Sequence, residues 1–259
     1  MNGLLANQDA LLLGADAVGA GIAARLAREG ARIMIIDDDR ERAEQVAGSL
    51  PDAAAMAVGC DLSDPQATWR TVDDLAAGLP ALALLVLNVL GTPYVAPLES
   101  QEDIAFGKSL SRVRAAAQAM RAAVPKLEAS GGGRIVFLGH RYGRTVNEGL
   151  AAYNTAAWAL IGLTRSAAAE WGRLKISTNL IVPFAQTAEL EAYRARRPRL
   201  IDTLMEQIPL RRAGDVEEDI GGAVVFLAGA GGAFINGEIV CADGGQHIAG
   251  PVLNPGKFR

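Results

Sequence analysis

Two side chains that can move a proton near neutral pH stand thirteen residues apart in the second half of the chain. His140 follows an apolar run, and Tyr153 lies in an alanine-rich stretch. A phenol can donate a proton and an imidazole can accept one, so the pair could serve acid–base chemistry. Ala157, four residues after Tyr153, offers no cation that would lower the pKa of a phenol. An unassisted phenol has a pKa of about 10 and is only ~0.1% ionised at pH 7, which makes it a poor base.

A glycine-rich turn near the start of the chain has the composition of a nucleotide-binding loop. Gly14 and Gly19 lie between an apolar run and a helical stretch, and Asp37 ends the next apolar run. Glycines let the backbone approach a pyrophosphate at a helix N-terminus, and the acid can bind ribose hydroxyls. A tight turn with a helix-capping acid would leave the same residues, so both interpretations stand.

Apolar runs and helical stretches alternate along the whole chain. The runs cover residues 10–13, 33–36, 54–60, 82–88, 134–138, 176–182 and 237–242. Helices are expected at 19–29, 39–50, from Asp64 onward, 102–128 and 151–171. Continuous apolar strands separated by helices are typical of a parallel sheet covered on both faces. No linker or repeat divides the chain, so we predict one doubly wound α/β domain over residues 1–259.

Composition excludes several classes of protein. The net charge of −4 does not favour nucleic acid or an anionic membrane as a partner. The two cysteines, Cys60 and Cys241, lie near apolar runs and are expected to be reduced, buried and inert thiols. The first residues lack the pattern of a signal peptide, and the apolar run 82–90 is too short to span a bilayer. We therefore expect a cytoplasmic protein with no metal site.

Taken together, the motifs resemble the short-chain dehydrogenase/reductase family over nearly the whole chain. The resemblance rests on the glycine turn with Asp37, on Asp61 in a segment like the one that touches the adenine, on Asn88 in a segment like Asn-Asn-Ala-Gly, and on residues 209–212, 218–220, 225–228, 236–237 and 242–245 near the C-terminus. It implies a Rossmann-type fold and NAD(P)-dependent oxidoreduction. By resemblance Tyr153 is the acid/base, and Gly14, Gly19, Asp37, Asp61 and Asn88 are the vestiges of the cofactor site.

The catalytic positions depart from the family pattern. The family uses a lysine where this chain has Ala157, and a serine where it has His140. The family's relay asparagine falls near Ser111 or Arg112. His140 is either a substitute base or a drifted residue in a disused pocket.

The cofactor positions depart as well. Ala17 replaces a glycine at the expected pyrophosphate, Leu90 replaces a small residue beside the adenosine ribose, and the ring of Phe184 could occupy the nicotinamide pocket. Ala188, or Thr187 with a shift, stands where a threonine is usual. We therefore expect no bound cofactor, and NAD if any.

The catalytic and cofactor positions are altered, whereas the rest of the chain resembles the family. This combination suggests a subunit whose role is in assembly. The resemblance implies contacts through a bundle of the two long helices and through the last strand, either with an active paralogue or with a second copy. The alternatives are a divergent NAD-dependent oxidoreductase using Tyr153 with His140, and a module that senses a nucleotide without turnover. Four arginines within 193–199 could grip phosphate or carboxylate groups, or simply form a solvated helical face.

Overall fold

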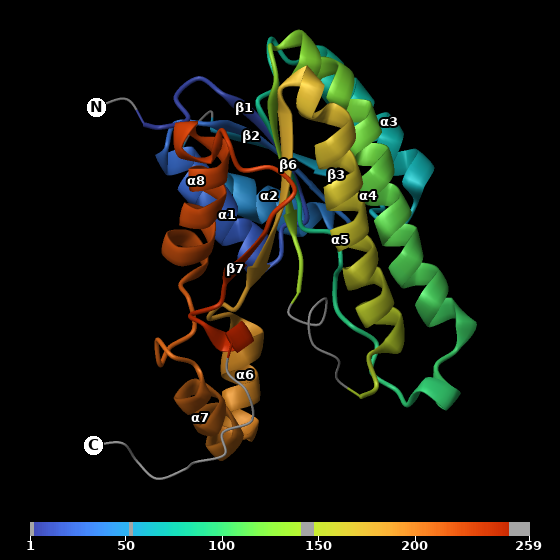
Figure 1. Ribbon diagram of the computed structural model, residues 1–259, viewed down its shortest axis with the longest axis vertical. Helices are drawn as coiled ribbons and strands as arrows, with labels where there is room; N and C mark the ends of the chain where they lie inside the picture. Colours follow the sequence, from blue (N-terminus) through green and yellow to red (C-terminus); the bar gives the residue numbers. More distant parts are fainter. Residues whose placement is uncertain (1–2, 52–53, 141–147, 249–259) are drawn as a thin grey trace.

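The computed structural model describes residues 3–51, 54–140 and 148–248 (Figure 1). Seven parallel strands form one sheet in the order β3-β2-β1-β4-β5-β6-β7. The strands are β1 (Asp9–Leu13), β2 (Arg32–Asp37), β3 (Ala55–Gly59), β4 (Leu84–Leu87), β5 (Gly133–Leu138), β6 (Ile176–Pro183) and β7 (Ile239–Ala242). Because β1 pairs with both β2 and β4, the strand order reverses there, and a crevice opens at the carboxyl ends of such strands.

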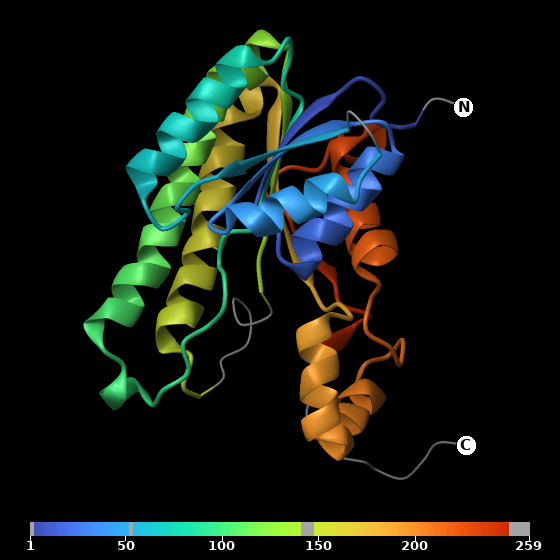
Figure 2. The same ribbon diagram turned by 180° about the vertical axis from the view of Figure 1, so that it is seen from behind.

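Helices cover both faces of the sheet (Figures 1 and 2). One face carries α1 (Ala17–Arg28), α2 (Arg40–Gly48) and α8 (Gly222–Ala228), and the other carries α3 (Pro65–Gly78), α4 (Asp103–Ala129) and α5 (Ala151–Trp171). Helices α6 (Ala188–Arg196) and α7 (Pro198–Gln207) extend beyond the carboxyl end of β6. Short helical turns lie at Leu98–Ser100, Gly172–Leu174, Val216–Gly221, Ala230–Gly232 and Gln246–Ile248 (η1, η3, η4, η5 and η6).

The core consists of two apolar layers, one on each face of the sheet. Along β1, Leu11 and Leu13 belong to the layer under α3, α4 and α5, whereas Leu12 belongs to the layer under α1, α2 and α8. This division follows from the two-residue period of a strand, whose successive side chains point to opposite faces. All three leucines are fully buried, which explains why the strand is apolar throughout.

The predicted doubly wound α/β fold is confirmed. Each expected strand appears with ends shifted by a few residues, and Gly30 has the positive φ of 88° expected after a helix end. Helix α1 starts at Ala17, two residues before the expected start, because the Asp16 side chain caps it. Within the described ranges, no helix is both long and apolar enough to cross a membrane.

Candidate functional site

A cleft of about 480 Å³ opens at the carboxyl ends of the central strands, at the reversal of strand order. It brings together the glycine turn, the end of β2, the end of β4, α4, the end of β5 and the start of α5. Its lining includes Gly14, Asp16, Ala17, Asp37, Asp38, Arg42, Leu62, Asn88, Leu90, Gly91, Arg112, Leu138, His140, Tyr153, Pro183 and Thr187. Most residues predicted for chemistry or cofactor binding therefore share one site, as the sequence indicated.

The glycine turn keeps the backbone geometry of a close-packed loop. Gly14 has φ +95°, and a Cβ there would lie 1.9 Å from the carbonyl oxygen of Asn88. A Cβ on Gly19 would lie 2.0 Å from the carbonyl oxygen of Gly14. Both positions require glycine for packing alone. The turn therefore preserves its shape whether or not a ligand uses it.

A carboxylate occupies the N-terminus of α1. Asp16 Oδ1 accepts hydrogen bonds from the backbone N–H groups of Val18 and Gly19, each at 3.0 Å. Asn88 donates its side-chain amide to the same oxygen at 2.7 Å. These donors and the helix dipole are what an anion binds at a helix N-terminus. Asp16 consumes them and adds a fixed negative charge, a feature that sequence reasoning missed.

Asp37 lies in the cleft, but both of its carboxylate oxygens already accept hydrogen bonds from other groups of this chain. The carboxylate is buried, and Oδ2 accepts the backbone N–H of Ala15 at 2.5 Å. Oδ1 accepts the N–H of Asp39 at 2.8 Å and pairs with the Arg42 guanidinium. Ribose hydroxyls would therefore compete with a neutralising cation and two backbone donors.

An ion pair joins opposite sides of the cleft. Arg112 extends from α4 to pair with Asp38, just after β2, and donates to the carbonyl of Val89, just after β4, at 3.2 Å. Asp38 also accepts the N–H of Leu62 at 2.6 Å. Strands β2 and β4 flank β1, so this bridge spans the crevice at the reversal of strand order. The guanidinium lies against Gly91, where an added Cβ would be 3.4 Å from Cζ.

Two aromatic rings meet at the other end of the cleft. The centroids of His140 and Tyr153 are 5.5 Å apart, and the rings are nearly perpendicular at 85°. Ala157 is one turn further along α5, 1% exposed, and packed in the apolar layer that also contains Tyr153. The structure thus joins the two predicted proton-moving groups, while the lysine position faces core.

Gln101, which sequence reasoning also missed, fixes the start of α5. Its side-chain amide donates to the carbonyls of Ala96 at 3.0 Å and Gly149 at 2.8 Å, and its oxygen accepts the N–H of Ala152 at 3.0 Å. The side chain satisfies one of the unpaired donors at the helix N-terminus. It thereby holds the turn that presents Tyr153.

Asp61, a predicted cofactor contact, lies outside the cleft lining. It is exposed, and its carboxylate accepts the Ser63 hydroxyl at 2.6 Å and the Ser63 N–H at 2.8 Å. These bonds hold the pKa of Asp61 below its usual range, the hydroxyl contributing most. Phe184, whose ring could have occupied the nicotinamide pocket, is not among the residues that line the cleft, whereas Pro183 before it is.

The four arginines at 194–199 lie on and between α6 and α7, and all but the half-buried Arg194 are exposed. Arg194 pairs with Glu191 at 3.3 Å, and Arg196 donates to the carbonyl of Ala192 at 3.2 Å. Arg197 and Arg199 are exposed. The structure favours the solvated face over a convergent anion site.

Comparison with known proteins gives one consistent family. A family model described as enoyl-(acyl carrier protein) reductase matches residues 14–247. An uncharacterized oxidoreductase of Mycobacterium tuberculosis is 33% identical over 90% of this chain and 89% of its own length. D-threitol dehydrogenase of Mycolicibacterium smegmatis is 33% identical over 92% of each chain.

Solved structures agree with these relatives. A putative short-chain alcohol dehydrogenase from Sinorhizobium meliloti superposes with a TM-score of 0.87 at 29% identity, over 95% of this chain and 98% of its own. An NAD⁺-bound xylitol dehydrogenase superposes with a TM-score of 0.85 at 26% identity, over 93% of this chain and 99% of its own. The chain belongs to the short-chain dehydrogenase/reductase family of oxidoreductases.

Proposed function

We propose that this chain is a catalytically impaired member of its family that serves as a non-catalytic subunit beside an active paralogue. The observation that carries the proposal is the ion pair between Arg112 and Asp38, which crosses the cleft where the family's cofactor would lie. A dinucleotide would have to break this pair before it could enter. Two further features of the cleft point the same way.

The residues present fit the pyrophosphate and the adenosine half of a nicotinamide dinucleotide poorly. At the pyrophosphate, Asp16 holds the helix amides and repels a second anion. At the ribose, Asp37 is already bonded to three donors. At the adenine side, Leu90 and the Arg112 bridge narrow the crevice. The proposed role therefore needs no catalytic step that uses this cofactor.

The end of the cleft that holds Tyr153 and His140 departs from the family pattern in a different way. The cation expected one helical turn after Tyr153 is replaced by Ala157, which is buried among apolar side chains. Ala157 itself supplies no positive charge that would stabilise a phenolate at Tyr153. His140 contacts the Tyr153 ring edge-on, where the resemblance places a substrate oxygen. Tyr153 could still donate a proton.

The outer face of the helix layer supplies a surface for the partner. On α5, Trp158 is 52% exposed, and Gly162, one turn later, is exposed with no heavy atom within 4 Å of an added Cβ. A large apolar side chain beside a glycine lets another helix approach closely. A known arrangement of this kind is the two-subunit dehydrogenase for hydroxybenzylsuccinyl-CoA in anaerobic toluene degradation, one subunit type of which is inactive. We propose this chain as a candidate for such a subunit.

A divergent NAD-dependent oxidoreductase is the second candidate. The contact between His140 and Tyr153 in one cleft favours it, because an imidazole beside the phenol could accept its proton. The relatives named as D-threitol and xylitol dehydrogenases are compatible with an alcohol substrate for such an enzyme. A nucleotide sensor without turnover is a third reading of the same cleft.

Purification from the native source tests the proposal. We expect the chain to elute in a stable complex with a family member that carries an intact Tyr-x-x-x-Lys motif, with dehydrogenase activity confined to that complex. The same paralogue produced alone is the control. If the paralogue is equally assembled and equally active without this chain, the subunit proposal fails. Alcohol oxidation by this chain alone would establish the divergent enzyme instead.

A further inference from the structure

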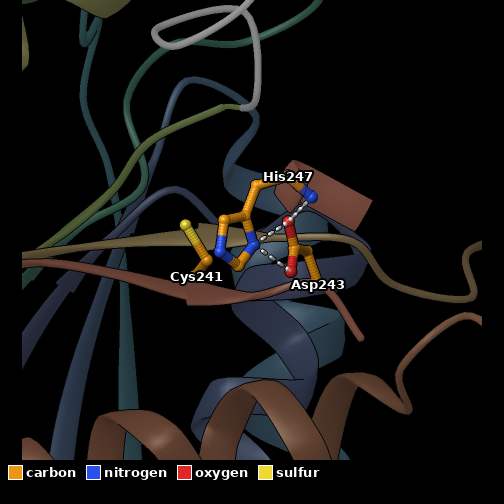
Figure 3. A group of neighbouring side chains, drawn as sticks. All are labelled: Cys241, Asp243 and His247. Carbon is orange, nitrogen blue, oxygen red and sulfur yellow. Dashed lines mark hydrogen bonds and ion pairs between the residues drawn. The ribbon is translucent and has the colours of Figure 1, made fainter. Parts of the chain in front are cut away.

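Three side chains with metal-binding atoms converge at the end of the last strand, although no metal site was expected from the sequence. Cys241 lies in β7, Asp243 follows the strand, and His247 lies in η6 (Figure 3). One donor atom from each, Sγ, a carboxylate oxygen and an imidazole nitrogen, lie within 4.8 Å of one another. None of these three described residues lines the cleft at Tyr153.

The turn after β7 fixes the position of the Asp243 carboxylate. Asp243 is 2% exposed, and its oxygens accept the N–H groups of Gly245 at 3.0 Å and His247 at 2.8 Å. In Figure 3 the imidazole of His247 lies between this carboxylate and the thiol of Cys241.

The distances suit a shared ion. His247 Nδ1 lies 2.9 Å and 3.0 Å from the two oxygens of Asp243. In a tetrahedral site two ligands bonded at about 2.1 Å are about 3.4 Å apart, so the imidazole and the carboxylate must separate by about 0.5 Å. A thiolate at about 2.3 Å from the same ion would be about 3.6 Å from the other donors. The three donor atoms lie within 4.8 Å of one another, so the sulfur must move inward by at most about 1.2 Å, an estimate from the same bond lengths. Rotation of the half-buried Cys241 side chain can supply this movement.

We propose that Cys241, Asp243 and His247 form a three-donor site for a divalent transition ion of the zinc class. Thiolate, imidazole and carboxylate are the donors that Zn²⁺ prefers. The two anionic donors balance the charge of the ion. Binding releases the thiol proton to solvent, and the imidazole proton moves from Nδ1 to Nε2 as Nδ1 becomes the ligand. The His247 side chain is 31% exposed, so a water can complete the coordination from that side.

The site has a structural consequence rather than a catalytic one. The ion would tie the edge strand β7 to η6, adding to the link that the Asp243 turn already makes. Half-burial of Cys241 corrects the expectation that both cysteines are buried, which holds for Cys60 alone. The chain thus carries one thiol in the core and one placed for coordination.

Titration of the purified full chain with Co²⁺ tests the site, because a Co²⁺–thiolate bond gives a charge-transfer absorption in the near ultraviolet. We expect one equivalent to produce this band, and Zn²⁺ to abolish it by displacement. Cys241→Ser should remove the band, and His247→Gln should lower the affinity at least ~10-fold. Asp243 is left unchanged because it also holds the turn.

The chain offers matched controls, since it has two cysteines and two histidines. Cys60→Ser and His140→Gln should keep the band and the affinity. Zn²⁺ should raise the melting temperature of the wild type and of both controls, but not of Cys241→Ser. A wild type without the band, or a band that survives Cys241→Ser, would overturn the proposal.

Discussion

The two faces of helix α5 differ in the side chains that they carry. Toward the sheet it carries Tyr153 and Ala157, both buried and in the same apolar layer. Toward the outside it carries Trp158 and Gly162, both exposed. The inward face thus has apolar packing at the position where the family pattern has a lysine, whereas the outward face exposes a large apolar side chain next to a glycine. This difference between the two faces is what the proposed subunit role would require.

Breaking the outward face should have the largest effect. Trp158→Asp places an unpaired charge at the proposed contact, which costs about 2–5 kcal/mol of binding free energy. We expect the complex with the active paralogue to dissociate and the partner's turnover to fall. Size-exclusion chromatography with light scattering and a turnover assay measure both. Leu200→Asp on α7 is the control, since Leu200 is 51% exposed on another surface and should change neither.

Introducing a lysine at Ala157 on the inward face should destabilise the fold without producing dehydrogenase activity. Ala157→Lys puts an ammonium into the apolar layer, so we expect the free energy of unfolding to fall by roughly 1–3 kcal/mol. Residues of a catalytic unit are non-additive, so one restored member gains little. Urea denaturation and an NAD-linked alcohol oxidation assay check the two claims. Thr155→Lys on the exposed face is the control, and robust oxidation by Ala157→Lys would show that the inward face is nearly intact.

The fold and the candidate site could be predicted from the sequence only in part. Strands, the glycine turn, and the meeting of Tyr153 with His140 were predictable, because each depends on local pattern or on the order of strands. The bridge from Arg112 to Asp38 was not, because it joins side chains 74 residues apart that carry no local signal.

Opening the cleft should have a moderate effect. Arg112→Ala removes the bridge to Asp38 and to the carbonyl of Val89, which frees space at the crevice. We expect any affinity for NADH, however weak in the wild type, to rise about tenfold, which corresponds to about 1.4 kcal/mol. Isothermal titration at high protein concentration measures it. An unchanged affinity would mean that Asp16 and Asp37, not the bridge, limit binding.

A similar ion pair outside the cleft gives the smallest effect. Arg212 lowers the pKa of Asp219 from 3.8 to about 2, chiefly through the hydrogen bond between them. The folded pKa is depressed, so the stabilisation is present above pH 4 and is lost as the pH falls toward 2. Both side chains are substantially exposed, so Arg212→Ala should cost under ~1 kcal/mol at pH 7. Urea denaturation between pH 2 and pH 7 tests this, and NADH affinity should not change.

The most direct measurement is the titration of NADH into the isolated wild-type chain. The Arg112–Asp38 pair crosses the cleft, and the Asp16 carboxylate occupies the N-terminus of α1. We therefore predict no saturable binding at low micromolar NADH, under conditions in which an intact paralogue saturates. A dissociation constant in the low micromolar range for this chain would contradict the account and favour the divergent enzyme that uses Tyr153 with His140, or the nucleotide sensor.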